Sequence, residues 1–407
     1  MALLTFDTAH KPRQAYTSMA VLLAVMVVFP FVAAQFGNSW VRIIDMALLY
    51  IMLALGLNIV VGFAGLLDLG YIAFFAVGAY LTGLLSSPQF AALLESVVNY
   101  HPDLQDAVVR TFGEDVRTNG IHLSVWFIIP LAGLVAGLFG ALLGAPTLKL
   151  RGDYLAIVTL GFGEIIRIFM NNLNDPINFT NGPQGINLID PVRIFGVSLA
   201  GEAGSRATVY VGGFGMPSVN AYYFLFLLLC IVTIFMTSRL QHSRLGRAWV
   251  AIREDEIAAK AMGINTRNVK LLAFSMGASF GGVAGAMFAA FQGFVSPESF
   301  SLTESIAVLA MVVLGGIGHI PGVVMGGVLL AALPEVLRHV VEPAQQALFG
   351  KVVIEAEVLR QLLYGLAMVL IMLNRPAGLW PSPVKEDRPN AALAKEEKER
   401  ENEEREA

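Results

Sequence analysis

The chain has 407 residues, of which 56% are hydrophobic and only 14% are charged. Soluble domains carry about 25% charged residues, so this composition favours a membrane protein over a soluble domain. The single cysteine, Cys230, excludes an intrachain disulfide and a metal site built from several cysteines. The net charge of −4 is small, and the charged residues gather in a few segments between long apolar runs.

Ten apolar runs are candidate transmembrane helices, because a helix needs roughly 20 mostly apolar residues to cross the hydrocarbon core. The first run follows basic residues, as a signal peptide does, but we interpret it as a helix because many more runs follow it. The sequence therefore predicts an all-α, polytopic transmembrane helical bundle of about ten helices. The runs are residues 19–36, 41–61, 67–85, 123–148, 154–173, 221–238, 269–291, 304–316, 320–340 and 359–374.

Lysine and arginine predict which helix ends face the cytoplasm, because cytoplasmic loops are enriched in both. The longest basic loop, residues 239–269, lies between the sixth and seventh predicted helices. With ten helices, this loop falls on the same side as Lys11, Arg13 and the basic link at 149–151. We therefore expect both termini to be cytoplasmic.

The expected organisation is one membrane domain with polar additions. Residues 1–18 form a cytoplasmic N-terminus, residues 19–376 form the membrane domain, and residues 377–407 form a charged tail whose composition predicts disorder or a frayed helix. Two insertions belong to the outer side. Residues 86–122 are polar and predicted to be partly helical, and residues 174–220 are rich in Gly, Asn and Pro, which predicts structured loop or short strands.

Glycines cluster at two places that resemble interrupted helices, residues 62–70 and 315–322. Breaks at comparable positions in two halves are expected where helix ends meet a solute at mid-depth, and five helices per half suit an inverted repeat. The predicted topology instead puts both breaks near the inner surface, which favours short cytoplasmic turns, and both interpretations stay open. The candidate residues of the translocation path or of the helix breaks are Asn58, Gly65, Asp68, Gly70, Gly315, Gly316 and Pro321.

Charges at membrane depth are functional candidates by default. Glu164 and Arg167 lie three residues apart in the fifth predicted helix, so one helical turn can pair them, and we favour a structural ion pair. The six histidines are scattered and none has the H-E-x-x-H spacing of a metal site. We therefore assign no catalytic residue, no metal and no enzyme activity.

The basic loop at 239–269 is too polar to span the membrane and too regular for a linker. Residues 248–262 are good helix formers without Pro or Gly, which predicts one short surface helix. Gly263 follows where a left-handed cap is expected, and Asn265 or Thr266 can cap the next helix. A structured element at this face predicts a docking surface, and an amphipathic helix resting on lipid is the alternative. The candidate coupling residues are Arg253, Glu254, Asp255, Glu256, Ala259 and Gly263.

The stretch GRAWVAIREDEIAAKAMGIN at residues 246–265 resembles the coupling segment of permeases in ATP-binding-cassette importers of the branched-chain amino acid (LIV-I, LivM-like) type. Residues 62–85, 150–172, 180–186 and 312–327 resemble further motifs of that family, in the same order. The resemblance covers roughly residues 58–376. The sequence departs from the family at Leu67-Asp68, at Tyr71 and in the longer 86–122 insertion, and these departures put fine substrate specificity in doubt.

The resemblance implies a bacterial inner-membrane subunit that works with a second, similar permease, two cytoplasmic ATP-binding subunits and a periplasmic solute-binding protein. ATP would be bound by the partner subunits, so the chain would need no cofactor, and no nucleic-acid partner is implied. The sequence itself supports the assignment of ATP binding to other subunits, because the chain has no G-x-x-x-x-G-K-[ST] phosphate loop. Leucine, isoleucine and valine are the default solutes, and other amino acids, amides or urea are alternatives.

An ion-coupled carrier is the second hypothesis, with Asp68 or Glu164 as the carboxylate that would exchange protons. The structured coupling segment favours the importer. We expect charge reversal at Glu256, or Gly263→Val, to leave the protein inserted and to uncouple ATP hydrolysis from transport. Valine at position 263 should be harmful because a β-branched residue fits a positive φ poorly.

Overall fold

The computed structural model describes residues 26–35, 37–98, 102–148, 150, 152–194, 196–200, 208–211, 214–349, 355–375 and 378–380. The predictions for residues 1–18, for the start of the first helix and for nearly all of the 377–407 tail lie outside the described residues.

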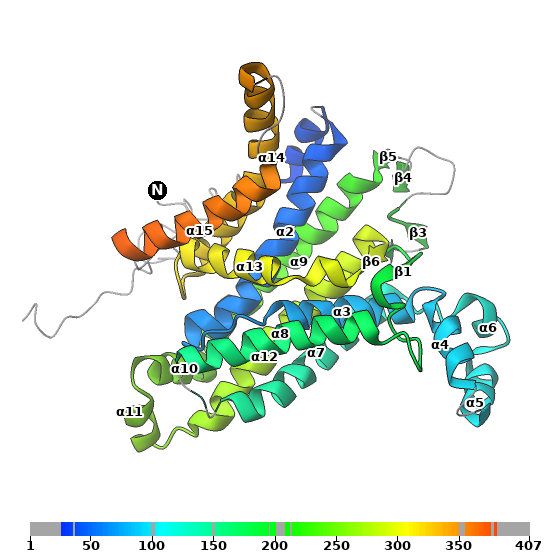
Figure 1. Ribbon diagram of the computed structural model, residues 1–407, viewed down its shortest axis with the longest axis horizontal. Coiled ribbons are helices and arrows are strands. Elements are labelled where there is room, and N and C mark those ends of the chain that lie inside the picture. The colour runs from blue at the N-terminus through cyan, green and yellow to red at the C-terminus, as the bar shows by residue number, and fades with distance from the viewer. Residues whose placement is uncertain are drawn as a thin grey trace, which may run out of the picture.

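The described part of the chain consists mainly of helices (Figure 1). These are Met26–Gln35, α2 (Asn38–Asn58), α3 (Ile72–Leu85), α4 (Gln89–Val98), α5 (Pro102–Phe112), α6 (Val116–Asn119), α7 (Val125–Thr147), α8 (Asp153–Asn172), α9 (Ser218–Gln241), α10 (Arg244–Glu254), α11 (Glu256–Ala261), α12 (Thr266–Gln292), α13 (Leu302–Gly315), α14 (Ile320–Phe349) and α15 (Ala356–Asn374). Shorter helical turns are the π-helical η1 (Ile59–Phe63), which continues α2, and the 3₁₀ turns η2 (Gly182–Gln184) and η3 (Pro297–Phe300).

Three two-stranded antiparallel sheets complete the described fold. Strand β1 (Ile186–Asn187) pairs with β6 (Phe294–Val295). Strand β2 (Arg193–Ile194) pairs with β3 (Val197–Ser198), and β4 (Thr208–Val211) pairs with β5 (Phe214–Pro217). All but β6 belong to the 174–220 insertion, so the prediction of short strands there is confirmed.

The all-α, polytopic class predicted from the sequence is confirmed, and each of the ten apolar runs coincides with a described helix. Five described helices are long and apolar enough to cross a membrane: α2 with η1, α7, α9, α12 and most of α14. A sixth span results if α3 and α4 count as one, although an 82° bend separates them. The other runs form shorter apolar helices, or α8, which carries three charged residues.

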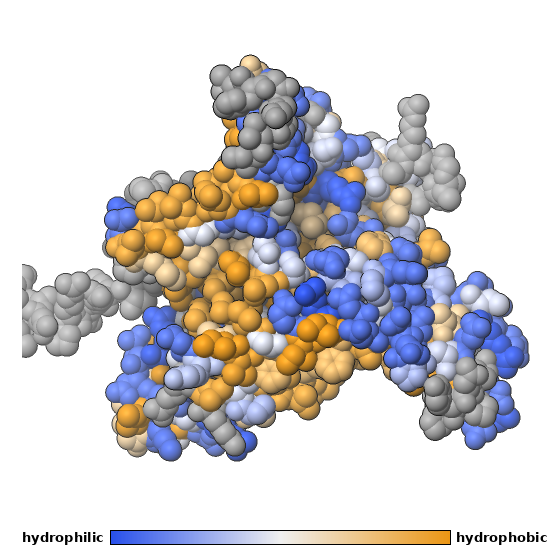
Figure 2. Space-filling view, in the orientation of Figure 1, coloured by the Kyte–Doolittle hydropathy of each residue, from blue (hydrophilic) through white to orange (hydrophobic). Residues whose placement is uncertain are grey.

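The polar additions lie at opposite ends of the bundle. Figure 1 shows α10 and α11 at one end, and α4 to α6 with the strands at the other. Figure 2 shows hydrophilic residues at these two ends and hydrophobic residues over much of the surface between them. This arrangement agrees with the predicted separation of a basic loop on one side of the membrane from two insertions on the other.

Helix α12 is the centre of the bundle and packs against α2, α3 and α7. Small residues let these backbones approach closely, as is typical of helices in membranes. A Cβ on Gly285 would collide with the carbonyl oxygen of Phe75 in α3. A Cβ on Gly282 would lie 2.5 Å from the carbonyl oxygen of Ala132 in α7. The glycines that follow one another at helical spacing in α12 are therefore packing residues.

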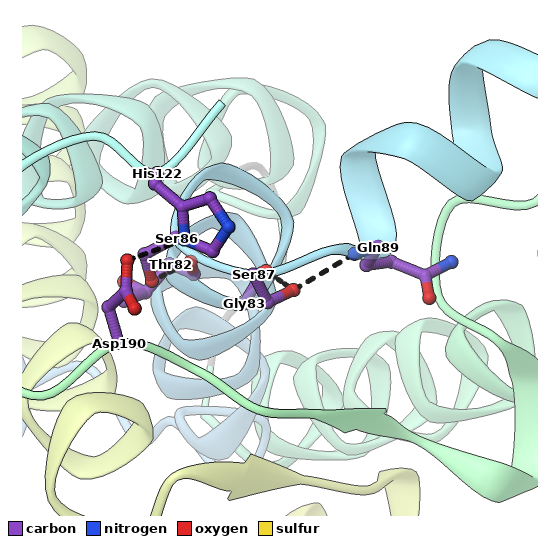
Figure 3. A network of polar contacts seen from close by, with 7 residues as sticks. All are labelled: Thr82, Gly83, Ser86, Ser87, Gln89, His122 and Asp190. Carbon is purple, nitrogen blue, oxygen red and sulfur yellow. Dashed lines mark hydrogen bonds and ion pairs between the residues drawn. The ribbon is translucent and has the colours of Figure 1, made fainter. Parts of the chain in front are cut away.

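The bend between α3 and α4 is held by two serines (Figure 3). The hydroxyl of Ser86 donates to the carbonyl oxygen of Thr82 at 2.7 Å, and the hydroxyl of Ser87 donates to that of Gly83 at 2.5 Å. Ser87 Oγ also accepts a bond from the backbone N–H of Gln89 at 3.2 Å. The Ser86 hydroxyl thus adds a second bond to a carbonyl that already accepts the backbone N–H of Ser86, and Ser87 joins the end of α3 to the start of α4.

A close side-chain contact joins the two polar insertions. His122 Nδ1 lies 2.6 Å from Asp190 Oδ2, and both side chains are partly exposed (Figure 3). The backbone N–H of Asp190 also donates to the carbonyl oxygen of Ser86 at 2.8 Å. A cavity of about 450 Å³ opens beside this pair. The end of α3 and the start of α7 are therefore linked through residues of both insertions.

Candidate functional site

The predicted coupling segment, residues 239–269, contains two short helices rather than one, and we keep this name for it below. The sequence predicted a single helix over residues 248–262, and this is wrong, because the chain is extended at Asp255 (φ −153°, ψ 109°) between α10 and α11. The Asp255 carboxylate caps the second helix by accepting bonds from the backbone N–H groups of Ile257 at 2.8 Å and Ala258 at 3.0 Å. Aspartate is among the strongest N-cap residues, and here capping outweighs helix propensity.

The turn into α12 follows the prediction. Gly263 has a φ of +86°, the left-handed conformation expected of a helix C-cap. The side chain of Asn265 accepts a bond from the backbone N–H of Asn268 and caps α12. Trp249 fixes α10 to the start of α12, because it is fully buried and its indole N–H donates to the carbonyl oxygen of Val269 at 2.8 Å.

A second contact fixes α11 to α12. Lys270 Nζ lies 2.8 Å from Glu256 Oε2, and the lysine side chain is only 8% exposed. A buried ammonium group needs a carboxylate partner, because desolvation without one is costly. Ala259 is also buried at this contact side of the segment. The coupling segment is thus held to a membrane helix by packing and by a charged pair.

Arg253 reaches from the end of α10 into the first helix break. Its Nη1 donates to the carbonyl oxygen of Gly62 in η1 at 2.6 Å, and its Nη2 lies 3.5 Å from a carboxylate oxygen of Glu254. Gly65 has a φ of +67°, and a Cβ there would lie 2.5 Å from Cγ of Arg253. The arginine side chain therefore lies directly against the glycine-rich break that follows α2.

The second helix break meets the first at the same place. The buried side chain of Asn58, at the end of α2, accepts a bond from the backbone N–H of Gly318 at 2.9 Å. A Cβ on Gly318 would lie 3.0 Å from Nη1 of Arg253 and 3.1 Å from the carbonyl oxygen of Gly62. The two glycine-rich segments, one from each half of the chain, thus meet at one arginine of the coupling segment. We call this group of contacts the break cluster; it consists of Asn58, Gly62, Gly65, Arg253 and Gly318.

The rest of the first break runs away from the break cluster and contacts α8 and α13. Asp68 is buried and accepts a bond from the backbone N–H of Gly70 at 2.9 Å. The backbone N–H of Leu69 donates to Thr159 Oγ1 at 3.1 Å, and Ser305 donates to the carbonyl oxygen of Leu69 at 2.5 Å. A Cβ on Gly70 would collide with the backbone of Thr159. Asp68 and Gly70 therefore fix the irregular chain between two helices.

The second break is a short turn between α13 and α14. Gly316 has a φ of +127°, and Pro321 lies in the first turn of α14, where its missing N–H is not needed. A Cβ on Gly315 would collide with the backbone of Gly322. His319 Nδ1 lies 2.9 Å from the carbonyl oxygen of Trp380, and burial lowers the pKa of this imidazole below its usual 6.5.

Glu164 and Arg167 form the expected ion pair within α8, with Nε and Oε2 3.0 Å apart and both side chains about 30% exposed. Glu164 lies roughly 16 Å along the helix from Asp153, so the pair belongs to the second half of α8. The structure thus brings Arg253, Gly65 and Asn58 together, and it places the Glu164–Arg167 pair in a different helix, α8.

Sequence reasoning missed three members of this arrangement. Trp249 and Lys270 hold the coupling segment, and Gly318 completes the break cluster. Lys270 carries the clearest sequence signal, since a lysine at the start of an apolar span needs a partner. Within the described residues, no group of three His, Cys, Asp or Glu side chains could hold a metal ion.

A family model described as the permease component of the branched-chain amino acid transport system matches residues 39–372. The chain belongs to this permease family. The matched region includes α2 to α14 and nearly all of α15, and so contains the coupling segment and both helix breaks. The resemblance inferred from the motifs is thereby confirmed.

Curated relatives agree with this membership. The chain is 40% identical to the high-affinity branched-chain amino acid transport system permease protein LivM of Escherichia coli (strain K12), over 89% of this chain and 74% of the relative. It is 26% identical to a probable LivM of Methanocaldococcus jannaschii, over 82% of this chain and 90% of the relative. The permease protein LivH of Escherichia coli (strain K12) is 39% identical over 26% of this chain and 32% of the relative. No solved structure matches the chain significantly.

Proposed function

We propose that this permease is the membrane subunit of an ATP-binding-cassette importer for leucine, isoleucine and valine. The substrate follows from the names of the LivM relatives, and the family membership supports the transport role. The break cluster is the single observation that carries the mechanism. It joins the coupling segment to both helix breaks through Arg253, so that a movement of α10 and α11 would reach α2 and the α13–α14 turn.

The outer surface of the coupling segment supports docking on an ATP-binding subunit. Ile257 is 72% exposed and Met262 is 84% exposed, although both are apolar. Charged residues surround them on the segment, including the exposed Lys260. Exposed apolar side chains rimmed by polar residues are typical of protein interaction sites. We infer that these two side chains enter a groove on the ATP-binding partner while Arg253, Trp249 and Lys270 anchor the segment to the membrane helices.

The complex that this proposal requires has further members. It contains a second, LivH-like permease, two cytoplasmic ATP-binding subunits and a periplasmic solute-binding protein. ATP is bound by the partner subunits, so this chain carries no cofactor and is not itself an enzyme. The basic loop and α10–α11 lie on the cytoplasmic side of the inner membrane, as do both termini, and the insertions at 86–122 and 174–220 face the periplasm.

Uptake of radiolabelled leucine tests the proposal. Cells that express this chain with its partners should take up leucine, and loss of the two ATP-binding subunits should abolish this uptake. An excess of unlabelled isoleucine or valine should compete, and urea should not. Uptake that persists without the ATP-binding subunits and collapses with a proton ionophore would contradict the importer and favour an ion-coupled carrier.

A further inference from the structure

An apolar groove of about 590 Å³ runs between α9 on one side and α7 and α12 on the other, with α2 as its floor. It is open to the surface, because Val232, Phe235 and Met236 of α9 are 43%, 59% and 49% exposed. The opposite wall is formed by side chains of α12, including Met276 and Phe280. A groove of this kind on a membrane-facing surface is covered by a hydrocarbon chain or by another apolar segment.

The groove has the length of one lipid leaflet. Its lining on α9 extends from Leu229 to Leu240, which is roughly 16 Å along a helix. Half of the hydrocarbon core is about 15 Å thick. The groove ends where α9 ends and α10 begins, at the polar end of the bundle that carries the coupling segment. It therefore lies in the leaflet next to that end.

Two arginines lie near the end of α9 that closes the groove. Arg239 lines it, is exposed, and places its guanidinium 5.3 Å from the ring centre of Phe235. Arg244 is exposed at the start of α10, just beyond the end of α9. Among the described residues, no carboxylate forms an ion pair with either arginine. Basic residues at this depth attract anionic headgroups, by about 1 kcal/mol for each residue near the surface.

We propose that this groove binds an anionic phospholipid of the adjacent leaflet. One acyl chain lies along α9 between Leu229 and Met236, and the phosphate lies against Arg239, with Arg244 within the same headgroup layer. The apolar lining explains why a lipid and not a free phosphate is the ligand. Because α9 passes directly into α10, the bound lipid fills the space beside the helix that carries the coupling segment.

Lipid retention tests the site. The purified transporter complex is placed in nanodiscs of equal phosphatidylglycerol and phosphatidylcholine with identical acyl chains, and the lipids that remain bound are measured by native mass spectrometry. The wild type should retain phosphatidylglycerol in preference to phosphatidylcholine. Arg239→Gln should reduce this preference roughly fivefold, the factor that corresponds to about 1 kcal/mol. Val232→Trp should fill the groove and remove bound lipid of both kinds.

Two variants serve as matched controls. Ile231→Trp places the same indole on the neighbouring residue of α9, which is 40% exposed and does not line the groove. Arg267→Gln removes an exposed charge at the start of α12, near the same end of the bundle. Both should retain lipid as the wild type does. Equal retention of the two lipids by the wild type, an unchanged preference in Arg239→Gln, or equal lipid loss in Val232→Trp and Ile231→Trp would overturn the proposal.

Discussion

Arg253 of α10 donates a hydrogen bond to the carbonyl oxygen of Gly62 at 2.6 Å, although 191 residues separate them in the chain. The carbonyl belongs to η1, the π-helical turn in which α2 ends. Such turns are frequent at functional sites because their backbone is less regular than that of an α-helix. The arginine therefore contacts the membrane domain at an irregular turn of its backbone.

Gly263 of the coupling segment and Gly65 of the first helix break both have a positive φ, but they should differ in their tolerance of alanine. Gly263→Ala costs only backbone strain, roughly 1–2 kcal/mol, because nothing lies within 4 Å of the added Cβ. Gly65→Ala adds a collision with Arg253 Cγ to the same strain. Thermal unfolding of the purified protein should show the larger fall in Tm for Gly65→Ala. Equal shifts in Tm would contradict the packing of Arg253 against Gly65.

The substitution Gly263→Asn tests whether backbone strain alone sets the stability cost of replacing Gly263. Because asparagine adopts the left-handed region more readily than other residues, Gly263→Asn should have a smaller effect on Tm than Gly263→Val. The earlier expectation that Gly263→Val uncouples transport stays a prediction. Substrate-stimulated ATP hydrolysis and leucine uptake, measured together, check it.

The Glu256–Lys270 pair should behave as a unit. Glu256→Gln leaves the buried ammonium of Lys270 without this carboxylate, and we expect a loss of about 2 kcal/mol in stability. The double variant Glu256→Gln with Lys270→Met removes the stranded charge, and its Tm should recover part of the loss. Lys270→Met can also be made alone in the wild type. If it lowers the stability by the same amount there as in Glu256→Gln, the two effects are additive and the pair makes no contribution to stability.

The ion pair in α8 should also behave as a unit. Glu164→Gln and Arg167→Gln each leave one charge without its neighbour, and we expect less folded protein in the membrane from either single variant than from the double variant. Glu114 and Arg117 of the 86–122 insertion form a pair at the same spacing, 3.6 Å apart. Since their side chains are 79% and 44% exposed, neutralising that pair should change the amount of folded protein little.

Local features of the fold were predictable from the sequence, and contacts between distant segments were not. Apolar runs located the helices, and Gly263 and Asn265 marked the turn before α12 because cap residues act locally. The break at Asp255 was missed because its neighbours are good helix formers, although an aspartate followed by a glutamate is a helix-start signal. The contact of Arg253 with Gly62 depends on how α10 packs, which no local pattern encodes.

The two helix breaks illustrate the same limit. Glycine clusters predicted both irregular segments, and the structure places them in contact through Asn58 and Gly318. No local pattern indicates that a single side chain of the coupling segment touches both. Whether solute passes near Asp68, Gly70 or Gly315 stays a prediction.

The number of ATP molecules hydrolysed per leucine transported tests the central claim that Arg253 links the coupling segment to the helix breaks. In the reconstituted complex with its binding protein, Arg253→Gln should still hydrolyse ATP but transport much less leucine, so that this ratio rises roughly tenfold. Arg253→Lys should restore part of the coupling, because a lysine retains a charged donor, and Arg267→Gln should match the wild type. A wild-type ratio in Arg253→Gln would contradict the account.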